Sequence, residues 1–542
     1  MTVCPRCSFV NSDQAKFCGV CGEPLTQRAP VKVEVKPIST STQSQLNKKE
    51  TCFYHAELPA SRFCARCGCP ICVECSKPYG ELYFCPECYW GLAPRASPKN
   101  ETAPAPTPAP KVSERLVLFK LSLLSILMGI VGAFVLYIFF FFEHYGIEFF
   151  WEILPHFFGI NQSVTLGIVS PLWVILMTLT GGLLVGIITK ASKVHPMLLL
   201  QEIEEIGKSG RYGLLDGIVG MIRGLVALVF GGSIGPEGPI TGAVAALGTW
   251  FAERANLSKP EVMVCLNAAV SGMFGGFFNT SFGWPLILME GGLESGKLSW
   301  KLILPAILAG SIGAGLFFVL TGASFMGIFV VPPVPGFDFV FLIYAAILGL
   351  VGSLLGMLFV FLFNLLKRLT KPWEMRRPIE LALLAGLFLG VVASGFPLVL
   401  FDGGSVNSLT LGTLIANAAG IGTPLLAMYS FMKIAVTTVC LALGWAGGIF
   451  FPTFFIGGAM GLAINQLFPF IPLAICMSCV MVGVVMPVTK LPLTISIVIA
   501  LAFGIRLSGV IAVAAVTSYL FAYSVHLKFG DEHGKGAHPN QS

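Results

Sequence analysis

Three long runs of apolar residues without a single charged side chain constrain this chain more than any other feature. They cover residues 121–142, 164–189 and 339–366. A bilayer core of about 30 Å needs roughly 20 such residues for one helix to cross it, so each run is long enough to span a membrane. The sequence therefore predicts an α-helical membrane protein that crosses the bilayer several times.

The composition agrees with this fold class. Hydrophobic residues make up 55% of the 542 residues and charged residues only 11%, whereas soluble domains carry about a quarter charged residues. The formal net charge of +6 is small for this length, so nothing indicates nucleic-acid binding.

Further apolar stretches are interrupted by glycine and proline. They cover residues 212–231, 236–251, 261–274, 302–322, 381–401, 409–443, 447–486 and 491–523. Irregular backbone at membrane depth is tolerated only where it is buried in protein or lines a water-filled cavity. Channels and transporters use such breaks to point helix N-termini at a substrate, so the pattern favours transport over a simple anchor.

The distribution of Lys and Arg predicts the orientation. Lys111, Arg115 and Lys120 precede the first long run, whereas the segment directly after it carries glutamates and no Lys or Arg. Basic residues also follow the other two runs. Because cytoplasmic loops carry an excess of Lys and Arg, we expect a multi-pass protein of the cell (plasma) membrane with both termini in the cytoplasm.

Twelve of the 16 cysteines lie before Tyr89. The chain opens directly into Cys4-Pro5-Arg6-Cys7 with no apolar segment behind it, so we expect no secretory signal. Cysteines kept on the cytosolic side stay reduced, which favours metal binding over disulfides.

The first cysteine module resembles a short zinc ribbon. Two Cys-x-x-Cys pairs offer four thiolates to one tetrahedral zinc ion. Its predicted ligands are Cys4, Cys7, Cys18 and Cys21.

The second module has eight potential ligands in four pairs, enough for two zinc ions, and it resembles the B-box and related cross-braced zinc folds. That resemblance implies one site of Cys52, His55, Cys72 and Cys75, and another of Cys64, Cys67, Cys85 and Cys88. Cys69 is left over and could replace a neighbouring ligand. We expect about three structural zinc ions per chain, and no enzyme active site, because protein ligands fill every position.

These features predict the domain organisation. We expect a zinc ribbon (residues 1–26), a linker (27–50), a B-box-like double zinc module (51–92), a Pro-rich linker (93–112), a transmembrane domain (113–527) and a cytoplasmic tail (528–542).

Two Gly/Pro loops stand out in the apolar region. Residues 231–239 and residues 447–452 each combine a glycine turn with the start of a helix-like segment. The free amides and partial positive charge of a helix N-terminus bind an anion without any basic side chain. One such loop in each half of the chain is expected when two repeats share a site near the midplane.

These loops resemble the signatures of the CLC family of voltage-gated chloride channels and proton–chloride antiporters. The first signature places Glu-Gly-Pro at a helix start, here within residues 235–239, and the second is Gly-Gly-Ile-Phe with a proline two residues later, here residues 447–452. A third segment, from Asn279 to Glu290, resembles the family's helix that ends in a carboxylate. The resemblance covers about residues 113–527.

The resemblance implies an inverted repeat of tilted and broken helices, and a homodimer with one pore per subunit. It implies that Glu237 is the gating carboxylate and that the backbone amides of Ile449 and Phe450 bind the central anion. The first loop would contribute Ser233, Gly235 and Gly238 to the anion site. Independently of the family, a carboxylate within an apolar region is costly and usually functional.

The family's serine loop, whose hydroxyl binds the central anion, is altered here. The corresponding residues are Ser192, Lys193, Val194, His195 and Pro196. Ser192 is a candidate hydroxyl donor, while alignment on the proline places Lys193 at the serine position. Loop or interfacial roles for Lys193 and His195 are equally compatible with the sequence.

The proton-coupling signature is altered as well. The family's antiporters carry paired glutamates, of which the second is the internal proton acceptor, but here Glu290 is followed by Gly291. Glu290 matches the first glutamate, and Glu294, one helical turn later, could replace the second, so Glu290 and Glu294 are a possible proton relay. The resemblance therefore favours channel-like or weakly proton-coupled conduction.

The family's anion path is closed on its internal side by a tyrosine. Tyr523 is the candidate, with Tyr519 one turn earlier as the alternative, and an interfacial aromatic role is open for both.

We therefore expect chloride transport across a membrane, although an amide-lined site also suits nitrate, bromide or fluoride. The alternative is a membrane-tethered interaction or regulatory protein, in which the zinc modules bind an unknown protein partner and the pore is inactive. A zinc-dependent ligase adaptor is a third interpretation that depends on the B-box likeness alone.

Overall fold

The computed structural model divides the chain into two units, Met1–Pro110 and Lys111–Ser542. In the first unit the structure describes residues 2–3, 10–11, 60–64, 70–73, 75–79 and 82–85. In the second it describes residues 114–162, 169–295, 300–322, 329–334, 336–402, 410–525 and 529.

The described part of the first unit consists of short antiparallel hairpins. Strand β1 (Thr2–Val3) pairs with β2 (Val10–Asn11), β3 (Arg62–Phe63) with β4 (Pro70–Ile71), and β5 (Lys77–Tyr79) with β6 (Leu82–Phe84). The buried side chains on and beside β3 to β6 are Ile71 and four cysteines, Cys64, Cys72, Cys75 and Cys85. Hairpins this short bury little apolar surface, so their stability must come from another source.

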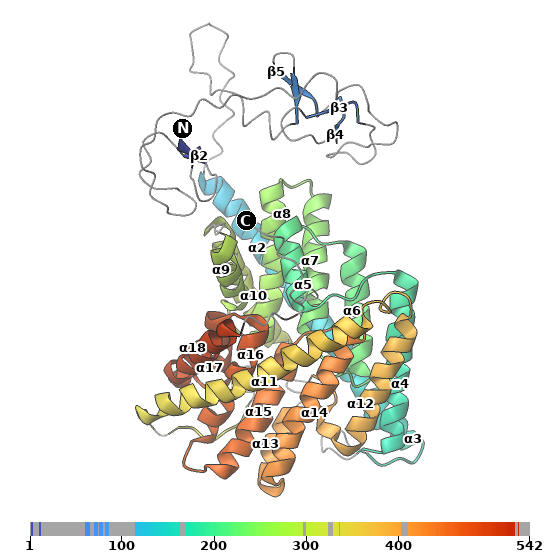
Figure 1. Cartoon of the computed structure of the whole chain (residues 1–542), viewed down its shortest axis with the longest axis vertical. Helices are drawn as coiled ribbons and strands as arrows, with labels where there is room; N and C mark the ends of the chain where they lie inside the picture. The colour runs from blue at the N-terminus through green and yellow to red at the C-terminus, as the bar shows by residue number, and fades with distance from the viewer. Residues whose placement is uncertain are drawn as a thin grey trace. The chain divides into compact units, whose positions relative to one another are not determined.

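The second unit is helical (Figure 1). Its α-helices are α2 (Glu114–Ile147), α3 (Leu154–Phe157), α4 (Pro171–Ser192), α5 (Leu199–Ser209), α6 (Leu214–Val229), α7 (Glu237–Arg254), α8 (Lys259–Phe278), α9 (Gly283–Ser295), α10 (Trp300–Thr321), α11 (Val340–Thr370), α12 (Pro378–Gly395), α13 (Thr410–Asn417), α14 (Thr423–Ala442), α15 (Phe450–Leu467), α16 (Leu473–Thr489), α17 (Pro492–Phe503) and α18 (Ser508–Ser524). A π-helical segment, η2 (Glu148–Ile153), joins α2 to α3, and 3-10 turns lie at η3 (Pro397–Val399), η4 (Ala418–Gly420) and η5 (Ile505–Leu507).

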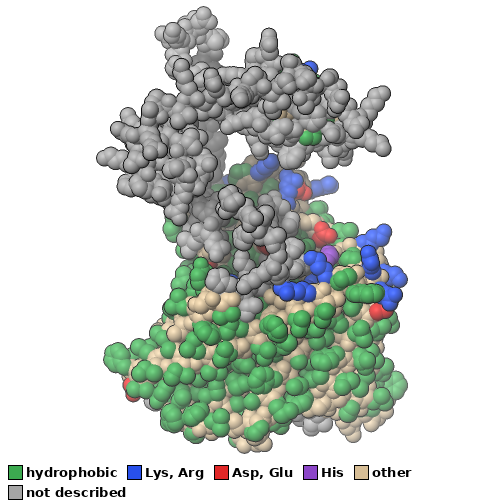
Figure 2. Space-filling model, in the orientation of Figure 1, with side chains coloured by type: hydrophobic (Ala, Val, Ile, Leu, Met, Phe, Trp, Pro, Cys, Tyr) green, Lys and Arg blue, Asp and Glu red, His purple; other side chains and the backbone are tan. Residues whose placement is uncertain are grey.

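Nine helices within the described residues are long and apolar enough to cross a membrane. They include α2, α4 and α11, which contain or overlap the three uncharged runs. The visible surface of this unit is largely hydrophobic, and its Lys and Arg side chains gather at one end, which we call the basic end (Figure 2). The positive-inside rule predicts that the basic end faces the cytoplasm.

Small residues let neighbouring helices pack backbone to backbone. A Cβ atom on Gly182 of α4 would lie 2.4 Å from the carbonyl oxygen of Ala382 in α12, and one on Gly272 of α8 would lie 2.5 Å from the carbonyl oxygen of Gly129 in α2. Lipid gives apolar helices little reason to associate, so close van der Waals contact of this kind holds membrane helices together.

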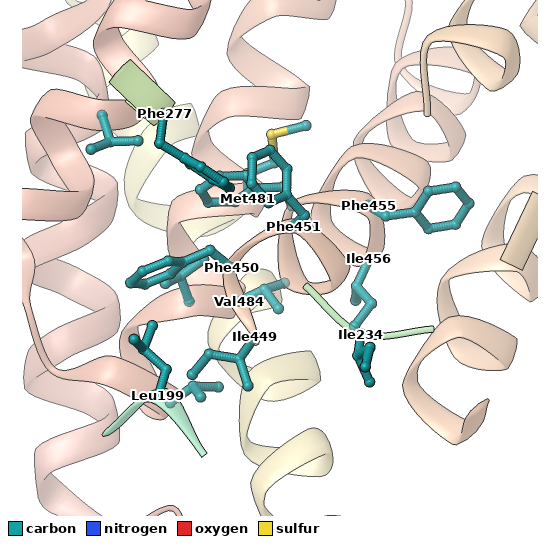
Figure 3. Packing of buried hydrophobic residues seen from close by; sticks show 14 of the residues in the cluster. Leu199, Ile234, Phe277, Ile449, Phe450, Phe451, Phe455, Ile456, Met481 and Val484 are labelled. Carbon is teal, nitrogen blue, oxygen red and sulfur yellow. The ribbon is translucent and has the colours of Figure 1, made fainter. Parts of the chain in front are cut away.

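The two Gly/Pro loops lie in the interior of the unit and are held by its apolar core. Ile234 of the first loop packs with Ile449 and with Ile456 of α15, and Phe450 and Phe451 fill the space beside them (Figure 3). All five side chains are buried. Helices α7 and α15 therefore both begin inside the protein rather than at its surface.

Candidate anion-binding site

The first and second loops are joined through their backbones. The amide of Gly235 donates to the carbonyl oxygen of Gly448 over 2.9 Å, and the amide of Gly448 donates back to Gly235 over 2.6 Å. This two-bond antiparallel bridge fixes the start of α7 against the start of α15, so residues from the two halves of the chain form one site.

Two glycines make this approach possible. A Cβ atom on Gly238 would lie 3.0 Å from the carbonyl carbon of Gly447, and one on Gly448 would lie 2.0 Å from Cδ of Glu237. Any larger residue at Gly448 would thus occupy the space of the Glu237 side chain.

Glu237, the first residue of α7, has its carboxylate at the N-terminus of α15. The amide of Phe450 donates to Oε1 of Glu237 over 2.5 Å. The amides of Ile449 and of Glu237 itself also interact with this carboxylate. Oε2 is buried and has no hydrogen-bond partner among the described residues. The Glu237 carboxylate therefore binds the same backbone amides that the sequence analysis predicts to bind the central anion.

Both helix N-termini favour negative charge at this point. The first amides of α7 and α15 have no partner within their own helices, and the aligned peptide dipoles place partial positive charge at each start. The site is buried, so water screens these dipoles little. The arrangement can hold one small anion, either the Glu237 carboxylate or a solute ion that displaces it.

The first loop also carries the other predicted anion-site residues, Ser233, Gly235 and Gly238. The Ser233 hydroxyl is buried and shares a hydrogen bond of 2.9 Å with the Thr437 hydroxyl of α14. Gly235 forms the bridge to Gly448, and Gly238 lies in the first turn of α7. The loop is thereby anchored to both α14 and α15.

A buried lysine that the sequence analysis missed is linked to Glu237 through Asp402. Lys433 of α14 is fully buried, and its Nζ donates to the carbonyl oxygens of Val399 (3.0 Å) and Phe401 (2.7 Å). The next residue, Asp402, is also buried and interacts electrostatically with both Lys433 and Glu237. The sequence contains a signal for this residue, because Lys433 is the only charged residue within the sequence of α14. Charged residues within membrane helices are usually functional.

The other predicted anion-path residues belong to α4 and α18 and have contacts within their own helices. Ser192 ends α4, and its hydroxyl donates to the Ile188 carbonyl oxygen over 2.7 Å, while Lys193 caps the helix in the left-handed conformation. Tyr523 of α18 is 63% exposed and stacks on Tyr519, which is partly buried against the core. Their part in the anion path stays a prediction.

Glu290 has a local partner in the second half of the chain. Its carboxylate accepts hydrogen bonds from the amides of Leu493 (2.7 Å) and Thr494 (2.9 Å) at the start of α17, and from the Thr494 hydroxyl. Glu290 therefore caps a helix. The side chain of Glu294 lies outside the described residues.

The predicted zinc ligands are only partly described. Cys64 and Cys85 belong to one predicted site, and Cys72 and Cys75 to the other; all four are buried. Within the described ranges no group of three or more His, Cys, Asp or Glu is placed to hold a metal ion. Each of the two sites predicted for the second module has only two described members, and the zinc-ribbon site has none. The other predicted ligands, Cys4, Cys7, Cys18, Cys21, Cys52, His55, Cys67 and Cys88, lie outside the described residues.

The fold and the two loops can be compared with known proteins. Residues 181–523 match the family model described as voltage gated chloride channel. The curated relatives include several with the name "Putative ion-transport protein YfeO". The one from Escherichia coli O1:K1 / APEC is 30% identical over 348 residues, and the one from Shigella boydii serotype 18 is 29% identical over 348 residues. Each alignment covers 63% of this chain and 78% of the relative.

Solved structures show the same fold. A slow cyanobacterial Cl⁻/H⁺ antiporter superposes with a TM-score of 0.61 at 16% identity, over 76% of this chain and 95% of that one. A CLC-type fluoride/proton antiporter gives a TM-score of 0.57 at 18% identity, over 78% and 98% of the two chains. A eukaryotic CLC transporter gives 0.60 at 15% identity, over 77% and 73%. The helical unit thus has the CLC transporter fold, and the chain belongs to the voltage-gated chloride channel (CLC) family.

Proposed function

We propose that this protein transports chloride across a membrane through a CLC-type pore gated by Glu237. The observation that carries the proposal is the hydrogen bond from the Phe450 amide to the Glu237 carboxylate. It places a removable negative charge on amides that suit a small anion. An ionised Glu237 blocks the site, and a protonated or displaced Glu237 leaves it open to chloride.

We propose further that conduction is channel-like or only weakly coupled to protons. Gly291 carries no titratable group where the family's antiporters have their internal glutamate, and the neighbouring Glu290 is engaged in capping α17. The names of two fold relatives include proton coupling, which is a property of those proteins. The expected orientation puts the basic end of the unit in the cytoplasm, and the expected assembly is a homodimer.

The remaining parts of the proposal concern the N-terminal modules. We expect them to bind about three zinc ions and an unidentified protein partner. The four described cysteines fit a thiolate site in type and burial. When bound, zinc would hold these short hairpins together, because a structural zinc site contributes folding free energy directly.

Chloride efflux from liposomes tests the proposal. Purified full-length protein is reconstituted, and efflux is followed with a chloride electrode under opposed pH gradients. Chloride efflux well above that of empty liposomes supports transport. If an inward proton gradient does not drive chloride against its own concentration gradient, this supports weak proton coupling. A well-folded protein that releases no chloride contradicts the pore and favours the tethered interaction protein.

A further inference from the structure

A second buried carboxyl group lies beside α7, toward the basic end of the helical unit. Glu202 belongs to α5, a helix of 11 residues outside the membrane-spanning set, and is only 5% exposed. Figure 1 shows α5 beside α7 in the half of the unit where α7 and α8 approach their connecting turn. Neither Gly/Pro loop nor the Glu290 segment includes this residue.

The Glu202 carboxylate packs directly against the backbone of α7. A Cβ atom on Gly242 of α7 would lie 2.9 Å from Oε1 of Glu202 and 3.2 Å from the Tyr212 hydroxyl. The absence of a side chain at Gly242 therefore creates the space in which these two polar groups meet. The Tyr212 amide also donates to the Thr249 hydroxyl of α7 over 3.1 Å, which ties Tyr212 to the same helix.

Glu202 has unused hydrogen-bonding capacity. Its Oε1 accepts a hydrogen bond from the Tyr212 hydroxyl over 3.3 Å, while its Oε2 has no partner among the described residues. Tyr212 is buried, but its neighbours Arg211 and Gly213 are exposed. The buried pair is thus one residue along the chain from solvent at the basic end.

Helix α7 connects Glu202 to the gate. Glu237 is the first residue of α7, and Gly242 follows five residues later, which corresponds to about 7.5 Å along the helix axis. Leu199, one turn before Glu202 in α5, packs toward Ile449 in the apolar core beside the second loop (Figure 3). The two buried carboxyl groups therefore lie at different positions along α7, Glu237 as its first residue and Glu202 of α5 beside Gly242.

Several charged groups face this pair. Arg223 of α6 is buried and interacts electrostatically with Glu202 and Glu374, and its guanidinium donates to the Val194 carbonyl oxygen over 3.1 Å. Asp216 of α6 interacts electrostatically with Tyr212. Glu374 accepts from Lys367 over 2.6 Å and lies 3.6 Å from Nε2 of His195. The side chain of His195 is 54% exposed, so the charged network continues from Glu202 to the surface.

Burial is the strongest influence on the titration of Glu202. It raises the pKa of Glu202 to about 8, despite the opposing effects of Tyr212, Arg223 and the Gly242 amide. The carboxyl group is then protonated below about pH 8 and ionised above it. Glu202 therefore changes its charge close to neutral pH, where an exposed glutamate would stay ionised.

We propose that Glu202 accepts protons from the basic-end side and relays them toward Glu237. This inference depends on the proposed function, and it assigns the weak proton coupling to Glu202 instead of Glu294. In the transfer, one O–H bond breaks at Glu202 and one forms at Glu237, with water carrying the proton between them and no change of oxidation state. Glu202 is reprotonated by water on the basic-end side.

The test compares proton and chloride fluxes in liposomes loaded with the full-length protein. A chloride gradient drives transport, while a pH electrode and a chloride electrode record the two ions. We expect measurable chloride-driven proton movement in the wild type. In Glu202→Gln the ratio of proton flux to chloride flux falls by about tenfold or more, because the amide cannot accept a proton. The flux ratio of this variant also loses its dependence on pH between about 7 and 9, while the chloride flux keeps the pH dependence set by Glu237.

Two further variants separate a relay from a structural role. Glu204→Gln lies on the same helix at an exposed position, and it keeps the wild-type flux ratio and pH profile. Tyr212→Phe removes the hydroxyl but keeps the ring, and it shifts the pH profile without abolishing chloride flux. A folded Glu202→Gln protein with the wild-type flux ratio overturns the relay, and so does a wild type that conducts chloride without moving protons. If the wild type conducts no chloride at all, the proposed function fails instead.

Discussion

The backbone amide of Phe450 donates a hydrogen bond of 2.5 Å to the side chain of Glu237, although 213 positions separate the two residues in the chain. This bond is possible because Gly235 and Gly448 exchange two backbone hydrogen bonds directly beside it. The side chain that fills the anion site thus belongs to the first half of the chain, while the amides that bind it belong to the second. In the proposed gating, movement of the Glu237 side chain empties the site.

Removal of the Glu237 carboxylate is expected to open the pore. Glu237→Ala leaves the amides of Ile449 and Phe450 in place, and Glu237→Gln mimics the protonated side chain. We expect chloride efflux at neutral pH to rise about tenfold or more in both variants, since each 1.4 kcal/mol of competition removed is worth a factor of ten. Efflux should also become nearly independent of pH, whereas low pH and high external chloride both favour opening of the wild type. Loss of efflux in a well-folded Glu237→Ala protein would show that the residue is structural.

A second route to the same state leaves Glu237 itself unchanged. In Gly448→Ala the new methyl group would lie 2.0 Å from Cδ and 2.2 Å from Oε1 of Glu237, so the carboxylate must leave the amides. We expect pH-independent efflux similar to that of Glu237→Ala, measured in the same liposome assay. Gly420→Ala is the matched control, because a Cβ atom there has no neighbour within 4 Å. Gly448→Ala efflux that keeps the wild-type pH dependence would contradict the gating role of the Glu237–Phe450 contact.

Much of the helical unit's fold can be predicted from the sequence, because the decisive features are local. Uncharged runs of sufficient length predict membrane helices, and a glycine turn before a helix start predicts an anion site irrespective of its partner. Glu237 stands out because a carboxylate in an apolar region needs a reason to be there. The contact between Glu237 and Phe450 follows once the two loops are assigned to one site.

Lys433 and Glu202 could not be placed in this way. Glu202 lies in a stretch rich in glutamate and lysine, which predicts a solvent-facing helix. It is buried where α5 packs against α7 at Gly242. Lys433 could be recognised as an unusual charge, but its partners are carbonyl oxygens of Val399 and Phe401, which sequence patterns do not specify. Such groups depend on tertiary packing between distant segments.

The N-terminal modules are expected to bring three zinc ions per chain, one in residues 1–26 and two in residues 51–92. Ligand arithmetic gives this number, since four cysteines form the first set, and seven cysteines with His55 form the other two. Elemental analysis of protein purified under reducing conditions measures it. The double variant Cys4→Ser/Cys7→Ser should lower the content to two, while Cys440→Ser, in the membrane helix α14, should leave it at three. One zinc ion or none in the wild type would contradict the modular interpretation.

Glu290 is expected to stabilise the fold and to play no part in proton movement. Glu290→Gln weakens the capping of the Leu493 and Thr494 amides at the start of α17, and lost caps cost about 1 kcal/mol. We expect a lower melting temperature in detergent and an unchanged ratio of proton to chloride flux. Glu204→Gln, on the exposed side of α5, is the control for a surface charge change. A normal melting temperature combined with a reduced flux ratio would instead assign the proton pathway to Glu290.

Replacement of Lys433 is expected to weaken both the fold and anion transport. Lys433→Met keeps an unbranched side chain that is one atom shorter, but it leaves the carbonyl oxygens of Val399 and Phe401 buried without their donor, at a cost of about 1–3 kcal/mol for such a group. It also removes the positive charge that offsets the negative charge of Asp402. The electrostatic potential at Glu237 then becomes more negative, which repels chloride. We expect a lower melting temperature and a several-fold lower chloride efflux. Lys190→Met, at an exposed position of α4, should change neither quantity. If Lys433→Met has the melting temperature and the chloride efflux of the wild type, Lys433 stabilises neither the fold nor the anion site. The segment that carries Asp402 is then held by other contacts.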